Sequence, residues 1–240
     1  MDTVSTTVLV TLVAFLAAFV RSAVGFGDAL IAMPLLALIL GMQTATPLVA
    51  FDASTIALFV LLGAWRRVDV GAAWRLVLST IVGIPFGLLL LSSAPEELIR
   101  ALLGVVLVGF GLYNLIAPNL PRLGSERWAC LFGLVAGILG GAYNTNGPPV
   151  VIYAALRQWP PERFRATLQG YFLPAGLTIV VSHGLAGLWT ARVVRLYLFA
   201  LPAIALAVLL GGLVNKRVSG TQFNRLVYGC LVVMGVMMFL

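Results

Sequence analysis

The sequence predicts an all-α polytopic membrane protein, and three observations support this fold class. Its 240 residues are 61% hydrophobic and only 10% charged, whereas a soluble domain carries about a quarter charged residues. Long apolar runs recur, among them 4–20, 76–91 and 196–214, and about 20 apolar residues let a helix cross a bilayer. These runs do not alternate between apolar and polar residues as barrel strands do. The chain therefore has too few polar residues to cover an aqueous surface.

The apolar segments fall into two sets of five. The first half contains 4–21, 28–41, 44–63, 72–92 and 97–117, and the second contains 127–142, 147–157, 163–184, 193–214 and 221–239. The residues PNLPRLGS, at 118–125, join the two sets. The first segment lacks both a basic leader and a small-residue cleavage site, so we expect it to be a span and not a signal peptide.

The two halves share spaced residues, which indicates an internal repeat. The residues ELIRALLGVVLV at 97–108 and QFNRLVYGCLVV at 222–233 place an arginine and a glycine at the same spacing. Further upstream, Gly25 corresponds to Gly140 and Pro34 corresponds to Pro149, at a smaller offset between the halves. The offset between matched residues grows along the chain, as loop insertions would make it. We therefore predict two homologous membrane repeats, residues 1–120 and 121–240, within one integral membrane domain.

An odd number of segments in each half predicts that the second half is inverted relative to the first. With the N-terminus outside, most basic residues fall on the inner side, where the positive-inside rule places them. Those on the inner side are Arg66, Arg67, Arg75, Arg122, Arg127, Arg157, Arg163, Arg165, Lys216, Arg217 and Arg225; those outside are Arg100, Arg192 and Arg195. The sequence therefore predicts both termini on the outer side.

Each half contains a broken hairpin at the same position. The residues SAVGFGDALIAMPLL begin at Ser22, and GILGGAYNTNGPPVVIYAAL begin at Gly137. The segments that follow the breaks, 28–41 and 147–157, are too short at 1.5 Å per residue to cross a core of about 30 Å. Full crossing and re-entry of the hairpins give the same sidedness, so both remain open. Short, Gly/Pro-interrupted segments at matched positions indicate a transporter site near the membrane midplane.

The two breaks, or tips, favour a small anion as the ligand. A helix that begins at a tip presents up to four unpaired N–H groups and a partial positive charge. Arg21 lies one turn before the first tip, and a guanidinium can hold an oxyanion with two parallel hydrogen bonds. The candidate substrate-binding residues are Arg21, Gly25, Phe26, Gly27, Asp28, Tyr143, Asn144, Thr145, Asn146, Gly147 and Pro148.

Ionisable and polar residues within the apolar segments have alternative explanations. Arg21 either binds or gates the anion, or extends to a membrane interface. Asp28 either caps the following helix, pairs with Arg21, or is a proton-linked carboxylate. Asp52 and Gln169 fall at corresponding positions of the two halves, and buried polar groups require partners. Asp28, Asp52 and Gln169 are therefore candidates for coupling or for the transport pathway.

Several function classes lack their signatures. The chain has one histidine and contains no HExxH, GxSxG or GxxxxGK[ST], so we expect no catalytic residues, no resident metal or cofactor and no ATP-driven pumping. The basic residues lie in short loops, which argues against nucleic acid. Cys130 and Cys230 lie in apolar segments and are expected to be inert buried thiols. An anion channel, a transporter of other small organic anions and a membrane-embedded enzyme remain as alternatives.

The tips also carry a family resemblance over essentially the whole chain. The motifs are Gly25-Phe26-Gly27 with Pro34, and Gly140-Gly141 through Asn146-Gly147-Pro148-Pro149 with Tyr153. In these motifs the sequence resembles the TauE/SafE sulfite exporters, the toluene-sulfonate uptake permease class. The resemblance implies a secondary transporter that exports small sulfur-containing anions across the bacterial inner membrane. In that membrane, the outer side predicted for both termini is the periplasm. The expected partners are the anion and the lipid bilayer, with a second copy of the chain as a further candidate.

Overall fold

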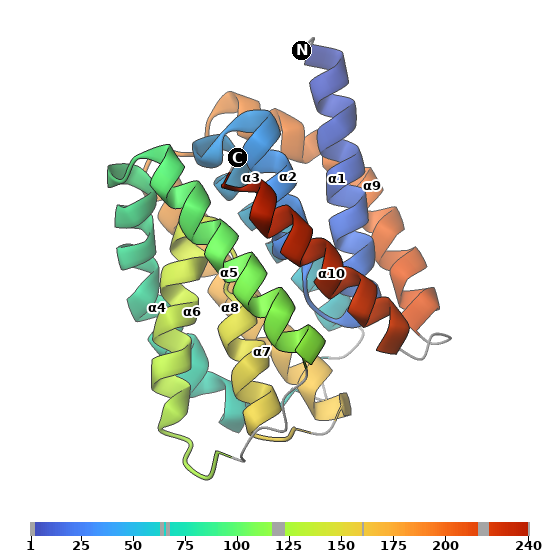
Figure 1. The fold of residues 1–240 in the computed structure, drawn as a ribbon. Helices are drawn as coiled ribbons and strands as arrows, with labels where there is room; N and C mark the ends of the chain where they lie inside the picture. The colour runs from blue at the N-terminus through green and yellow to red at the C-terminus, as the bar shows by residue number, and fades with distance from the viewer. Residues whose placement is uncertain are drawn as a thin grey trace.

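The computed structural model describes residues 3–62, 65, 68–116, 123–159, 161–215 and 221–239, and these residues form ten helices and no strand (Figure 1). The helices are α1 (Thr3–Val24), α2 (Asp28–Leu40), α3 (Met42–Leu62), α4 (Val70–Ser93), α5 (Glu96–Ile116), α6 (Trp128–Tyr143), α7 (Gly147–Leu156), α8 (Pro161–Leu185), α9 (Ala191–Asn215) and α10 (Thr221–Met237). Each helix corresponds to one predicted segment. The predicted all-α polytopic fold class is confirmed.

The helices have the length and surface of membrane spans. Within the described residues, α1, α3, α4, α5 and α9 are long and apolar enough to cross a bilayer. Large apolar side chains cover the outward face of α9, among them Leu198, Phe199, Leu206, Leu209 and Leu213. An exposed apolar band of this kind faces lipid and not water. The chain is therefore a multi-pass membrane protein.

Glycines bring α4 and α6 into close contact. Gly83 and Gly87 of α4 lie four residues apart, and Gly137 is one of several glycines on the facing side of α6. A Cβ on Gly87 would lie 2.0 Å from the carbonyl oxygen of Ile138, and one on Gly137 would lie 2.2 Å from that of Thr80. Small residues at this spacing let membrane helices pack backbone against backbone.

The helices of the two halves pack in matched pairs. α1 packs on α9 and α6 on α4, so the first helix of each half contacts the fourth helix of the other. α3 pairs with α8, and α5 pairs with α10. In Figure 1, α1 descends from the N-terminus while α6 rises from the lower loop. This pattern is what an inverted repeat would produce; the inversion and the division at residue 120 stay predictions. Most of the predicted junction at 118–125 lies outside the described residues.

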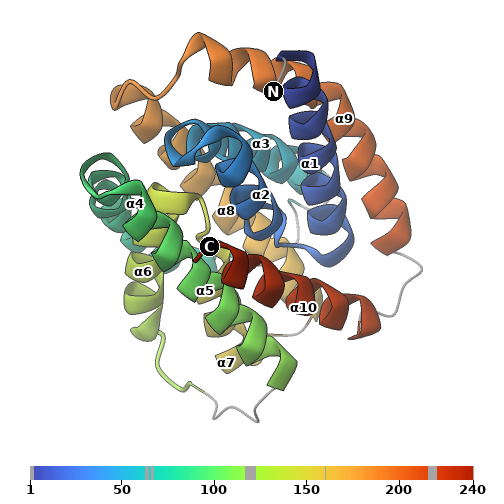
Figure 2. The ribbon, with the colours of Figure 1, turned by 45° about the horizontal axis from the view of Figure 1, so that its top comes forward.

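The two tips lead into the interior of this bundle. Figure 2 shows α2 and α8 towards the middle of the molecule, with α1 and α9 on one side and α4 and α6 on the other. Most residues of α2 are buried, and the buried residues lie on all faces of the helix. A half-length helix can be enclosed in this way because neighbouring helices separate it from lipid.

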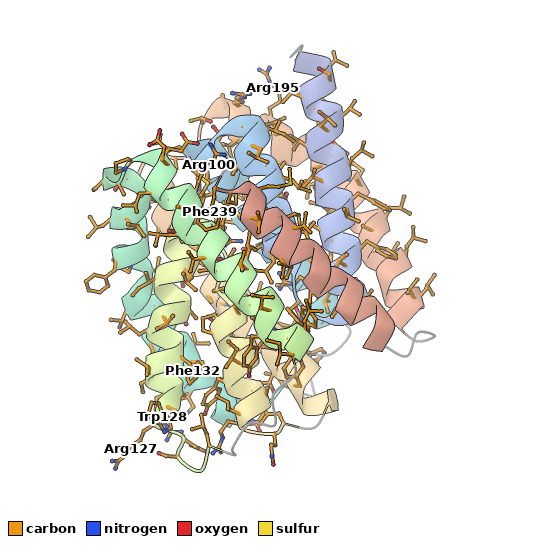
Figure 3. The ribbon with its side chains drawn as sticks, in the orientation of Figure 1. Arg100, Arg127, Trp128, Phe132, Arg195 and Phe239 are labelled. Atoms are coloured by element: carbon orange, nitrogen blue, oxygen red, sulfur yellow. The ribbon has the colours of Figure 1, made fainter. Side chains whose placement is uncertain are left out.

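The prediction for Cys130 is wrong, because its side chain is exposed. Cys130 lies in the first turn of α6, beside the exposed residues Trp128 and Leu131. Figure 3 shows Trp128 at the lower end of this helix. The side chain of Cys230 lies outside the described residues.

Candidate functional site

The first tip contains two glycines with positive φ angles. α1 ends at Val24 and α2 begins at Asp28, and between them Gly25 and Gly27 have φ angles of 103° and 102°. Side-chain-bearing residues rarely adopt such angles, whereas glycine does so readily. Phe26, between the glycines, is buried and packs edge-on against Phe110 of α5. The N-terminus of α2 is thereby held inside the protein.

The second tip makes the same change of direction with different residues. α6 ends at Tyr143, and Asn144 adopts a left-handed conformation with φ of 54°. The Asn144 N–H donates to the carbonyl of Gly140 at 2.8 Å, which closes the end of α6. Its side-chain Nδ2 donates to the carbonyl of Val49 at 3.2 Å. This bond fixes the second tip to α3 in the other half.

The two tips meet in one small pocket. Its lining residues are Gly27, Asp28, Ala29 and Leu30 from the first tip, Asn144, Thr145, Asn146, Gly147 and Pro148 from the second, and Phe172 from α8. The pocket is small: its free volume is about 10 Å³, which is room for about one water molecule. The residues at the N-termini of α2 and α7 thus line the same small pocket.

Neither helix N-terminus is capped by a side chain. In α2 the first backbone bond that the N-terminal turn makes is from Ile31 N–H to the carbonyl of Gly27, at 3.2 Å, so the preceding N–H groups have no acceptor within the helix. Pro148 and its neighbour Pro149, at the start of α7, have no N–H. At this tip, side chains must therefore supply more of the hydrogen-bond donors. Thr145 is 1% exposed and its Oγ1 has no hydrogen-bond partner. The pocket therefore offers donors and a positive helix-end potential.

Arg21 lies behind the first tip and is only 2% exposed. Its Nη1 donates to Oδ2 of Asp28 at 2.6 Å and to the carbonyl of Ala53 at 3.1 Å. The other nitrogen, Nη2, donates to Oε1 of Gln169 at 3.1 Å. Among the alternatives for Asp28, the structure shows pairing with Arg21. This ion pair places no net charge beside the pocket.

Gln169 connects Arg21 to the tip itself. While its Oε1 accepts from Arg21, its Nε2 donates to the carbonyl of Gly25 at 2.7 Å. The guanidinium of Arg21 also lies over the ring of Phe172, 4.7 Å from the ring centroid. Phe172 thus borders both the pocket and the arginine. A change in the position of Arg21 would be transmitted to the pocket through Asp28 and this ring.

The predicted site residues separate into two groups. Those that line the pocket are Gly27, Asp28, Asn144, Thr145, Asn146, Gly147 and Pro148. Those outside its lining are Arg21, Gly25, Phe26, Tyr143, Asp52 and Gln169. Asp52 is 4% exposed, and both of its carboxylate oxygens are buried with no hydrogen-bond partner.

Apart from Ala29 and Leu30, which directly follow the first tip, the lining residue that the sequence analysis missed is Phe172. It lies three residues after Gln169 in α8, a spacing that places both side chains on the same helix face. That spacing is the sequence signal that could have identified Phe172 as a site residue. No group of three or more histidine, cysteine, aspartate or glutamate side chains able to hold a metal occurs in the described part of the chain.

Comparison with known proteins gives one family and one curated relative. The family model described as "Sulfite exporter TauE/SafE" matches residues 10–238. The "Probable sulfite/organosulfonate exporter TauE" of Cupriavidus necator is 27% identical over 177 residues, which cover 73% of this chain and 68% of that protein. No solved structure matches. The family match covers nearly the whole chain and includes both tips.

Proposed function

Because the chain belongs to the sulfite exporter TauE/SafE family, we propose that it is a secondary transporter that exports small sulfur-containing anions by alternating access. The substrates are sulfite, sulfonates or related organosulfur anions. The observation that carries this proposal is that residues of both tips line one and the same pocket. The TauE protein of Cupriavidus necator, a probable exporter of sulfite and organosulfonates, supports the same substrate class.

The pocket favours an anion whose oxygens point in several directions. The N-terminus of α2 belongs to one tip, and Thr145, whose hydroxyl has no partner, and Asn146 line the pocket from the other. A sulfonate or sulfite carries three oxygens that can each accept a hydrogen bond. Since Asp28 is paired with Arg21, the helix ends supply the net attraction.

The size of the pocket means that the protein must change conformation to admit an anion. Room for about one water is too little for a sulfur oxyanion, so the surrounding helices must separate before the anion enters. A transporter that opens to one side at a time meets this requirement, whereas an open channel has a continuous passage. We propose no enzymatic activity for this chain.

We further propose that the protein resides in the bacterial inner membrane with both termini in the periplasm. Figure 3 shows Arg127, assigned to the inner side, at one end of the molecule and Arg100 and Arg195, assigned to the outer side, at the other. The N-terminus lies at the same end as Arg195 (Figure 1). These positions support the predicted sidedness of the chain.

The test is substrate binding and transport by a variant of the second tip. Asn146→Leu removes a donor and adds apolar bulk at the pocket, so sulfite or sulfonate binding should weaken at least about tenfold, equivalent to about 1.4 kcal/mol. Binding is measured by thermal shift of the purified protein, since a ligand that binds the folded state raises its stability. Transport is measured as efflux from proteoliposomes.

Asn114→Leu is the matched control, because Asn114 lies on α5 and bonds the carbonyl of Phe110 within its own helix. It should bind and transport like the parent. If Asn146→Leu also behaves like the parent, the pocket is not the binding site. Flux that keeps rising with substrate concentration, without saturation, would replace the carrier with a channel.

A further inference from the structure

Asp52 is a buried carboxyl that the pocket does not explain. It lies in α3, is 4% exposed and has no hydrogen-bond partner on either oxygen. The carbonyl of the next residue, Ala53, accepts from Arg21 at 3.1 Å. Arg21, which pairs with Asp28, thus also bonds the backbone of α3 at the residue next to Asp52. Arg21, Asp28 and Asp52 therefore form one electrostatic group beside the pocket.

The charges of this group do not balance. The positive charge of Arg21 is engaged by Asp28 at 2.6 Å, which leaves Asp52 without a cation. With all three groups ionised, the group would carry one net negative charge next to the proposed anion pocket. An ionised carboxylate inside a membrane protein is expensive unless a partner compensates it.

The other helices that pack against α3 supply no second cation here. Among the described residues, the polar groups that bond elsewhere are Asn144 to the carbonyl of Val49, Gln169 to Arg21, Tyr197 of α9 to Thr55, and Glu96 of α5 to the N–H of Met42 at the start of α3. His183 of α8 contacts the carbonyl of Gly141 through Nε2, and its Nδ1 has no partner. A neutral imidazole that donates from Nε2 carries no proton on Nδ1. Among the described residues, Arg21 is the cation that bonds to this region. A compensating charge must then come from solution.

We propose that Asp52 binds a proton and that this proton and the transported anion bind together, each favouring the other. The proposal rests on the proposed function, because the anion is the ligand of the pocket described above. A proton on Asp52 makes the group of Arg21, Asp28 and Asp52 neutral, and an anion in the pocket then meets no uncompensated carboxylate. A bound metal cation would require several oxygen ligands around it; a proton requires one carboxyl oxygen.

The contacts also give a route between the two sites. The Nε of Arg21 is buried and, like the oxygens of Asp52, has no partner. Once Asp52 loses its proton, Arg21 is the cation that it can attract, and a shift of Arg21 loosens its contact with Asp28. Since Asp28 lines the pocket, loss of the proton weakens the anion site, and binding of the anion favours the proton.

The first test measures anion affinity against pH in the parent and in Asp52→Asn. Ethanesulfonate is the probe, since its charge stays constant between pH 5 and 8. In the parent we expect affinity to fall with rising pH, by up to tenfold per pH unit, with uptake of up to one proton per anion bound. Calorimetry in two buffers of different ionisation heat counts that proton. Asp52→Asn should bind with an affinity that does not depend on pH and without proton uptake.

Glu97→Gln is the control, because it removes an exposed carboxylate at the start of α5 and should keep the parent's pH profile. Asp52→Glu should restore the pH dependence if the carboxyl is what matters. Parental pH dependence in Asp52→Asn would overturn the inference while leaving anion binding intact. Dependence on sodium in place of pH would overturn it as well.

The second test needs no anion. The infrared spectrum of the parent should contain the C=O band of a protonated carboxyl that is missing in Asp52→Asn and present in Glu97→Gln. Absence of that difference band would contradict the proton on Asp52. If neither sulfite nor ethanesulfonate binds the parent, the proposed function fails, and the infrared result still decides whether Asp52 holds a proton.

Discussion

At the scale of single residues, Arg21 holds the centre of the site together. It contacts α2 through Asp28, α3 through Ala53 and α8 through Gln169. Four helices from both halves thus converge on one buried guanidinium. Such an ion pair is expensive to break from one side only, because the remaining charge stays in the interior.

This leads to a prediction on stability. Arg21→Gln leaves the Asp28 carboxylate buried without its cation, so the free energy of unfolding should fall by about 3–5 kcal/mol. The double variant Arg21→Gln with Asp28→Asn removes both charges and should recover a substantial part of that loss. Thermal unfolding of the purified proteins in detergent measures both, with the pair compared as a double-mutant cycle.

Arg75→Gln is the matched control for the arginine substitution. Arg75 pairs with Glu126 at the molecular surface, where both side chains are partly exposed, so its loss should cost less than about 1 kcal/mol. A double variant no more stable than Arg21→Gln alone would show that the buried pair does not account for the effect.

Sequence reasoning found most of the pocket but not its connections. The tips were predictable because Gly25, Gly27 and the run from Asn144 to Pro148 interrupt apolar segments, and that interruption is a local signal. The pairing of Asp28 with Arg21 was one of several alternatives, since the backbone path between Gly25 and Gly27 decides it. The contact of Gln169 with Arg21 joins residues far apart in the chain, and no local pattern specifies it.

At the scale of elements, glycine determines how closely helices approach. A Cβ on Gly137 of α6 would meet the carbonyl oxygen of Thr80 at 2.2 Å and the Cα of Gly83 at 2.8 Å. Backbone atoms cannot move aside as the end of a side chain can. We therefore predict that Gly137→Ala forces α4 and α6 apart and lowers the free energy of unfolding by about 1–3 kcal/mol.

Gly109→Ala on α5 provides the comparison, since a Cβ there meets nothing within 4 Å. Alanine is also the better helix former, so this variant should be at least as stable as the parent. Thermal unfolding in detergent again measures the difference. Equal stability of the two alanine variants would mean that the close contact between α4 and α6 does not contribute to stability.

The helices themselves were largely predictable from composition. The segment predicted at 28–41 is α2, Asp28–Leu40, and the segment predicted at 147–157 is α7, Gly147–Leu156. In the sequence, Gly27 and Gly41 flank α2, and Gly147 marks the beginning of α7. What composition did not predict was the choice of neighbours, such as α6 beside α4, because any apolar helix face can pack on another until steric detail such as Gly83 against Gly137 selects the pair.

At the scale of the whole molecule, the arrangement of the pairs relates the two halves. The first helix of each half packs on the fourth of the other, and the two tips meet in one pocket. Neither half alone forms that pocket. In the alternating access proposed above, movement of either tip would open or close the pocket.

The sidedness of the molecule gives the last prediction. In a background with Cys130 and Cys230 replaced by serine, single cysteines placed beside Asp2 and after Leu240 should react with a membrane-impermeant thiol reagent added to intact cells. Cysteines beside Arg67 and Lys216 should react only after the membrane is opened. These four positions lie outside the described residues. The labelling is therefore a test of the predicted number of membrane crossings and of the sidedness inferred from the basic residues.

The physical reason for this outcome is the distribution of basic residues. Arg100 and Arg195 lie at the same end of the molecule as the N-terminus, and Arg127 lies at the opposite end (Figure 3). Since more of the basic residues belong to the end of Arg127 in the predicted topology, the positive-inside rule assigns that end to the cytoplasm. Labelling of only one terminus from outside would contradict five segments per half, because an even number of crossings places both termini on the same side. Labelling at Arg67 and Lys216 in intact cells, with both termini protected, would reverse the orientation but keep the inverted arrangement.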